Sequence, residues 1–183
     1  YDDALKDFDM VIKLDANNAI AYANRGLVYA EKKQYENALY DCSRAIKLKP
    51  DLSSAYTNRG FVYSLKKDYD NALKDLNKAV SLDPNQTLAY SYRGKIFDEK
   101  KDYDNAFKDF NKTIELDPNN IDALSFIGNY LFKQNKFDDS IRYFNKAIKL
   151  STRNYMGHIS RGDAYFAKNE YENALKDYDK AIE

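Results

Sequence analysis

The most constraining feature of this chain is a spacing of 34 residues between the residues that disturb helices. All three prolines keep this interval, and so do five of the six glycines: Gly26, Gly60, Gly94, Gly128 and Gly162, with Pro50, Pro84 and Pro118. A fixed period of this length indicates that one structural unit is repeated along the chain. Because stacked units present an extended surface rather than a closed pocket, the pattern favours binding over catalysis.

The same period divides the chain into six segments. Residues 19–52, 53–86, 87–120 and 121–154 are complete units, residues 1–18 are the second half of a unit, and residues 155–183 lack the last five positions. In the unit that starts at Ser53, a first helix carries Tyr56 and Tyr63 on one face, and a second carries an apolar stripe from Tyr69 to Val80. A short polar turn joins them, and a proline follows the second helix. The sequence therefore predicts an all-α protein of about five and a half helix pairs.

In register, these residues resemble the tetratricopeptide repeat (TPR). The resemblance rests on Tyr56-x-x-x-Gly60-x-x-Tyr63, then Tyr69-x-x-Ala72-x-x-x-Leu76-x-x-Ala79 and Pro84, and it recurs in every unit. It implies a single TPR solenoid over residues 1–183, a right-handed superhelical stack of antiparallel helix pairs whose first helices line a concave groove. It also implies a scaffold or adaptor for protein–protein interaction rather than an enzyme.

The repeated glycine predicts a close helix–helix contact inside each unit. A glycine in a helix interior costs about 1 kcal/mol relative to alanine, so its repetition requires a recurrent gain. We expect that gain to be the close approach of the paired helix.

Charged residues next to that glycine follow a second pattern. An arginine precedes it in four units and an aspartate stands sixteen residues later: Arg25, Arg59, Arg93 and Arg161, with Asp41, Asp75, Asp109 and Asp177. The remaining unit has Ile127 and Tyr143 at these two positions, so each unit has both charges or neither. This predicts an ion pair between the two helices of each unit. The alternative is that residues 121–154 have diverged as a whole.

Composition argues against several classes of function. The 29 basic and 29 acidic residues cancel, so no strong field attracts nucleic acid or an anionic membrane, and no apolar run is long enough to span a bilayer. Cys42, the only cysteine, occupies a core position, which predicts a buried thiol and favours a reducing, cytoplasmic location. His158, the only histidine, stands where three other units have Tyr22, Tyr56 and Tyr90, which indicates packing. The Asp-Tyr-Asp-Asn-Ala segments at 68–72 and 102–106 read as helix starts. We expect no catalytic residue, no cofactor and no metal.

The candidate site is the surface of the first helices that the solenoid would turn into its groove. Ala23, Thr57, Leu65 and Glu99 are expected to face it, together with eight residues predicted to bind a partner: Asn24, Leu27, Asn58, Phe61, Tyr92, Lys95, Phe126 and Asn129. Apolar groups there form a diagonal strip, which is typical of a partner site. The aromatic side chains would anchor an extended peptide or short helix, and the amides and the lysine would orient it. The alternative is that each aromatic packs against the first helix of the neighbouring unit.

Two other kinds of partner follow from the resemblance and from the ends of the chain. TPR proteins that clamp the carboxylate tails of chaperones use lysines in flanking units, but the matching positions here hold Ala23, Leu27, Thr57 and Leu88, so a co-chaperone clamp looks incomplete. The chain opens and stops inside a unit, which predicts a section of a longer protein. Uncapped ends of a solenoid favour end-to-end association into homo-oligomers, which is the alternative function.

Overall fold

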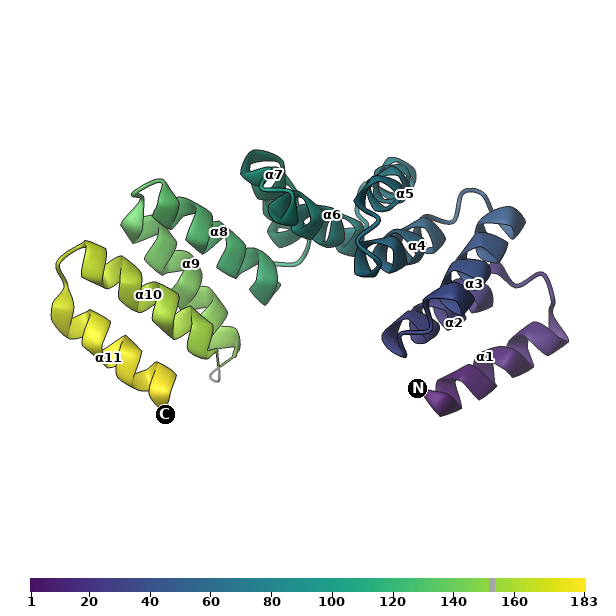
Figure 1. Cartoon of the computed structure of the whole chain (residues 1–183), viewed down its shortest axis with the longest axis horizontal. Helices are drawn as coiled ribbons and strands as arrows, with labels where there is room; N and C mark the ends of the chain where they lie inside the picture. Colours follow the sequence, from purple (N-terminus) through teal and green to yellow (C-terminus); the bar gives the residue numbers. More distant parts are fainter. Residues whose placement is uncertain (152–153) are drawn as a thin grey trace. The chain divides into compact units, whose positions relative to one another are not determined.

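The fold is built from helices throughout the part of the chain that the structure describes. The computed structural model describes residues 1–151 and 154–183, and eleven α-helices lie within them (Figure 1). They are α1 (Asp2–Leu14), α2 (Ala19–Glu31), α3 (Tyr35–Leu48), α4 (Ser53–Leu65), α5 (Tyr69–Leu82), α6 (Thr87–Glu99), α7 (Tyr103–Leu116), α8 (Ile121–Lys133), α9 (Phe137–Leu150), α10 (Tyr155–Ala167) and α11 (Tyr171–Ile182). The helices form about five and a half antiparallel pairs, which confirms the all-α repeat fold.

Contacts between residues divide the chain into two compact units, Tyr1–Lys100 and Lys101–Glu183. The first unit holds α1 to α6 and the second holds α7 to α11. Within each unit a helix packs on its neighbours in sequence, and the first helices of successive repeats also touch, as α2 touches α4 and α4 touches α6. In the first unit, α2 and α4 are therefore each covered by the second helix of their own repeat and by the first helix of the next.

The turn between the two helices of a repeat has the same geometry each time. In the repeat that begins at Ser53, the amide of Lys67 donates to the carbonyl of Ser64 at 2.9 Å, and that of Asp68 donates to Tyr63 at 2.9 Å. These bonds satisfy the last carbonyl groups of the helix, and they require one residue of the turn to have left-handed backbone geometry, with positive φ. Left-handed backbone recurs at Lys33, Lys67, Lys101, Asn135 and Asn169, with φ between 59° and 62°.

The second helices begin and end where the sequence predicts. The carboxylate of Asp68 accepts hydrogen bonds from the amide nitrogen of Asn71 at 3.3 Å and from its side chain at 2.8 Å. Helix α5 ends at Leu82, and Asp83 is extended with φ −136°, directly before Pro84. These contacts confirm that the acidic segments are helix starts.

The repeated glycine lies against the second helix of its own repeat. A Cβ added to Gly60 would lie 2.8 Å from Cγ of Leu76 and 3.2 Å from the carbonyl oxygen of Ala72. A Cβ added to Gly128 would lie 2.6 Å from the ring of Phe144. The two carbon–carbon distances, 2.8 and 2.6 Å, are shorter than carbon atoms tolerate, so the predicted close approach is confirmed.

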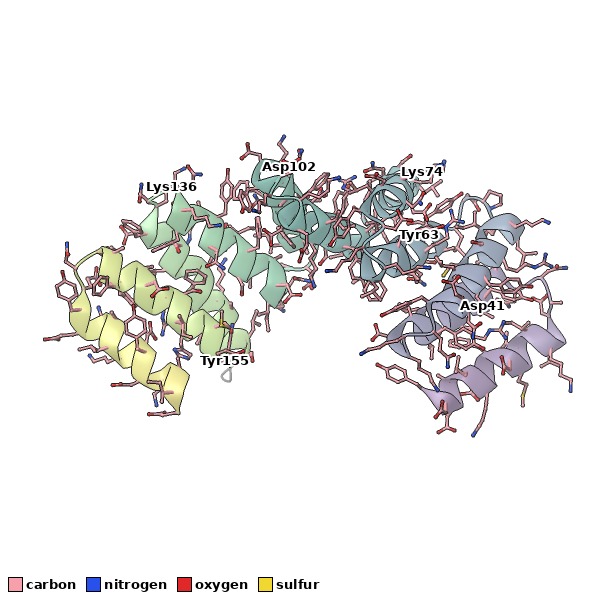
Figure 2. The ribbon with its side chains drawn as sticks, viewed as in Figure 1. Asp41, Tyr63, Lys74, Asp102, Lys136 and Tyr155 are labelled. Carbon is pink, nitrogen blue, oxygen red and sulfur yellow. The ribbon has the colours of Figure 1, made fainter. Side chains whose placement is uncertain are left out.

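The predicted ion pair within a repeat is present in both units. Arg59 donates from Nε to Asp75 Oδ2 at 2.7 Å and from Nη2 to Oδ1 at 2.9 Å. Arg25 makes the same two bonds to Asp41 of α3 (labelled in Figure 2), at 2.7 and 2.8 Å. In the second unit, Arg161 Nε donates to Asp177 at 2.7 Å. The aspartates are buried, so each pair joins two helices through a bidentate contact.

Each arginine also has a partner that sequence reasoning missed. Its Nη1 donates to a polar side chain sixteen residues earlier, on the second helix of the preceding repeat: Asp9, Ser43, Asn77 or Asn145. Where Ile127 replaces the arginine, Asn111 instead donates to the carbonyl of Phe107 in its own helix at 2.9 Å. The arginine thus ties its repeat to the one before it.

Candidate functional site

A hollow lies between the first helices α4 and α6 of the first unit. It encloses about 410 Å³. It is lined by the end of α4, the turn that follows, the start of α5 and the outer part of α6: Phe61, Ser64, Leu65, Lys67, Tyr69, Tyr92, Lys95, Ile96 and Glu99.

An aromatic stack forms part of its wall. The rings of Phe61 and Tyr92 lie 4.5 Å apart with an angle of 17° between their planes. One ring belongs to α4 and the other to α6, so the stack joins the first helices of successive repeats. The packing alternative is therefore confirmed for this pair, and the same two rings also line the hollow.

The charges around the hollow are mixed. Lys67, Lys95 and Glu99 line it, and the carboxylate of Glu31 on α2 acts on Tyr92. Burial, and secondarily the negative charge of Glu31, raises the pKa of the Tyr92 hydroxyl above its usual value. The phenol is therefore a neutral donor at physiological pH, beside apolar rings and charges of both signs.

Three of the eight residues predicted to bind a partner line this hollow: Phe61, Tyr92 and Lys95. Asn58 lies elsewhere. Its side chain is buried, and Nδ2 donates to the carbonyl oxygen of Ala23 on α2 at 2.9 Å. This position faces the preceding repeat, and Tyr92 occupies the equivalent position one repeat later, which explains why Tyr92 reaches back to Phe61.

Two residues expected to face the groove are instead in the core. Ala23 is fully buried in a cluster with Ala45 and Ala55. Thr57 is also buried, and its hydroxyl donates to the carbonyl oxygen of Ser53 at 3.1 Å. The expectation was wrong for both because the first helix of the next repeat covers this side of the helix.

The remaining predicted residues lie outside the hollow. Asn24 and Leu27 are half-buried on α2. Phe126 and Asn129 belong to α8 in the second unit, where Asn129 is exposed. The ring of Phe126 packs 4.5 Å from that of Phe110.

Sequence reasoning missed four of the lining residues: Ser64, Lys67, Tyr69 and Ile96. Tyr69 and Ile96 occupy apolar repeat positions, which look like core from sequence alone. For Lys67 the sequence did carry a signal, because a lysine or asparagine recurs at this position in every turn. The structure shows that all of these residues have positive φ.

The only cysteine and the only histidine of the chain both take part in packing between helices. Burial raises the pKa of the Cys42 thiol to about 12. His158 Nδ1 lies 2.9 Å from Asp177 Oδ1, so the imidazole joins the ion pair of α10 and α11. Across residues 1–151 and 154–183, no group of three or more His, Cys, Asp or Glu side chains is placed to hold a metal ion. None of the helices described is long and apolar enough to cross a membrane.

Comparison with known families decides what kind of chain this is. Sequence models described as tetratricopeptide repeat match residues 19–52, 53–86, 87–120 and 127–183. The chain belongs to the tetratricopeptide repeat family. TPR chains are scaffolds for protein interaction and are usually not enzymes. A search of curated protein sequences finds no match to this TPR chain.

Solved structures share the fold of this TPR chain. YrrB, described as a TPR protein with an unusual peptide-binding site, is 23% identical, with a TM-score of 0.76 over 96% of this chain and 90% of YrrB. MamA is 22% identical, with a TM-score of 0.75 over 90% of each chain. The pilF protein of Pseudomonas aeruginosa is 20% identical, with a TM-score of 0.80 over 90% of this chain and 75% of pilF.

Proposed function

We propose that this TPR chain is a non-enzymatic scaffold or adaptor, acting as one solenoid over residues 1–183, that binds a protein partner through an extended peptide or short helix. The observation that carries the proposal is the hollow beside the stacked rings of Phe61 and Tyr92. An apolar side chain of the partner enters this hollow and contacts the rings.

The size and chemistry of the hollow suit a peptide. Its volume of about 410 Å³ is at the lower end of the range of small-ligand pockets. The neutral hydroxyl of Tyr92 and the ammonium of Lys95 are donors for backbone carbonyls, and Glu99 accepts from amides. The peptide-binding site in the description of YrrB supports the same class of ligand.

Contacts outside the hollow extend the proposed interface. Asn24 and Leu27 lie on α2, a helix that touches α4. They are the candidates for contact with the rest of the peptide. Phe126 and Asn129 are candidates for a separate contact on the second unit. Asn58 is left out of the contact set, since its amide nitrogen already bonds Ala23. We place the interaction in the cytoplasm.

A library of displayed random peptides, selected on residues 1–183, tests this proposal. Selected peptides are then measured by fluorescence anisotropy against the wild-type chain and against Leu65→Glu. Leu65 lines the hollow and is 40% exposed, so the charge disturbs binding more than folding. We expect affinity to fall at least about tenfold, which corresponds to about 1.4 kcal/mol.

The matched control is Tyr40→Glu, which places the same charge on α3. Tyr40 is 69% exposed and does not line the hollow. Its peptide affinity should equal that of the wild type, and melting curves of both variants verify the fold. Selection of no peptide at all, or equal binding to Leu65→Glu, would refute the proposal.

A further inference from the structure

The hollow of the first unit opens beside an aromatic position that recurs along the chain. Tyr69, the first residue of α5, lines the hollow between α4 and α6, and all three helices belong to the first unit (Figure 1). Each of the five repeats that have both helices begins its second helix with a ring: Tyr35, Tyr69, Tyr103, Phe137 and Tyr171. The side chains that lie against the other rings therefore show which chemistry suits this place.

Two repeats of the second unit place a phenylalanine of their own first helix on this ring. The ring of Phe132 on α8 lies 5.6 Å from that of Phe137, with 55° between their planes. The ring of Phe166 on α10 lies 5.3 Å from that of Tyr171, with 63° between their planes. Aromatic pairs prefer such distances and tilts, because the positive edge of one ring then meets the negative face of the other.

Two other repeats use a side chain of the first helix that follows. Phe61 of α4 packs together with Tyr35 against the buried cluster that contains Ala30. In the second unit, Nζ of Lys133 on α8 lies 4.6 Å from the centre of the Tyr103 ring. Three of these four places are thus occupied by a phenylalanine and one by a lysine.

At Tyr69 both of these positions hold other residues. Ser64 stands where the two repeats of the second unit have a phenylalanine, and Lys95 stands where α4 has Phe61. Tyr92 packs against the same core cluster as Tyr69, but its ring is stacked on Phe61. In the part of the chain that the structure describes, no aromatic ring pairs with that of Tyr69. The hollow is therefore the place of a ring that this repeat does not supply.

The polar groups of the hollow favour an aromatic ring over a cation. The hydroxyl of Ser64 donates to a carbonyl oxygen of its own helix at 2.7 Å, so it is not directed at a ligand. The charged residues of the lining are two cations and one acid: Lys67, Lys95 and Glu99. This balance disfavours a partner lysine of the kind that lies over Tyr103.

We propose that the hollow selects a phenylalanine side chain of the partner, which takes the place that Phe132 has in the second unit and meets Tyr69 edge to face. The inference rests on the proposed function for the peptide that carries the ring, and it names the side chain that the hollow recognises. An aliphatic side chain has no edge to present and fills less of the volume of about 410 Å³, so it binds less tightly.

Capped single amino acids test the choice of side chain without a peptide. The N-acetyl methylamides of phenylalanine, leucine and arginine are titrated into isotopically labelled chain in the millimolar range, where ligands of this size bind. We expect saturable backbone amide shifts at Ser64, Tyr69 and Ile96 with the phenylalanine derivative. The leucine and arginine derivatives should bind at least about threefold more weakly. Equal or tighter binding of either one, or no shifts in the hollow with phenylalanine, would overturn the inference.

The variant Ser64→Phe closes the hollow with a ring of the chain itself. Because it copies Phe132 and fills space, its melting temperature should be no lower than that of the wild type. Its affinity for the phenylalanine derivative should fall at least about tenfold, since the ring occupies the volume that the ligand needs. The matched control Ser81→Phe puts the same ring on an exposed position of α5 outside the hollow, and it should bind as the wild type does. Undiminished binding to Ser64→Phe contradicts the inference, and if this variant does not fold, the three derivatives on the wild-type chain decide.

Peptides selected on the wild-type chain separate this inference from the proposed function. If selected peptides lose affinity with Leu65→Glu but not when their aromatic residues are replaced by leucine, the proposed function stands and the aromatic preference is wrong. If the phenylalanine derivative binds in the hollow and no peptide is selected, the aromatic site stands and the proposed function is wrong.

Discussion

Replacing one residue of the ion pair between Arg59 and Asp75 should lower the free energy of unfolding strongly. Replacing both residues by a matched apolar pair should lower it little. Asp75 is 4% exposed and accepts two hydrogen bonds from Arg59. The change Arg59→Ile leaves this carboxylate buried without its cation and removes the bond to Ser43, so we expect a loss of about 3 kcal/mol in the free energy of unfolding. Asp75→Ala should cost less, about 2 kcal/mol, because the arginine side chain is partly exposed and regains water.

The repeat at residues 121–154 shows how both charges are replaced together. Ile127 is fully buried where the other repeats have arginine, and Tyr143 stands where they have aspartate. The double variant Arg59→Ile with Asp75→Tyr should therefore lie within about 1 kcal/mol of the wild type, because an apolar pair of suitable volume replaces a buried ion pair at little net cost.

Urea unfolding followed by circular dichroism measures the four corners of this cycle, with the transition checked for two-state behaviour. The matched control is a cycle on Lys112 and Glu115, an ion pair of 2.6 Å whose glutamate side chain is 66% exposed. Its coupling should not exceed about 1 kcal/mol, as for other surface pairs. Coupling at the buried pair that is no larger than in this control would show that the charges are not energetically linked.

Three further predictions concern the glycine, the acid limb of stability and the thiol. Gly60→Ala should lower the free energy of unfolding by about 1–3 kcal/mol, because overpacking exceeds the gain of about 1 kcal/mol in helix propensity; a more stable variant in urea would contradict the close approach. Burial alone would raise the pKa of Asp177, but hydrogen bonds from Arg161 and His158 lower it below its usual value of 3.8. The ionised carboxylate of Asp177 therefore stabilises the fold fully above its usual pKa, and this stabilisation is lost as pH falls through the native pKa. Asp177→Asn should then flatten the acid limb of a plot of stability against pH. An unchanged slope would count against a stabilising role of this carboxylate. Cys42, with a thiol pKa raised to about 12 by burial, should react with iodoacetamide only as fast as the chain unfolds, and rapid labelling of the native protein would be incompatible with its place in the core.

The sequence located part of the candidate site for a specific reason. Phe61, Tyr92 and Lys95 lie on the side of the first helix that periodicity leaves outside its own repeat, and they line the hollow. Asn58 lies on the same side, yet its amide bonds Ala23 in the core between α2 and α4. Helical periodicity reports which face a residue occupies, but it does not report which neighbouring helix covers that face.

The period of 34 residues by itself determined the helix pairs, their caps, the close approach at Gly60 and the ion pair of Arg59 with Asp75, because each of these depends on residues inside one repeat. Only the tertiary structure decided what depends on the contact between repeats. The second bond of each arginine, the stack of Phe61 on Tyr92 and the burial of Thr57 all arise there. The physical reason is that burial and pairing depend on the distance between helices in space, which a position within the repeat does not encode.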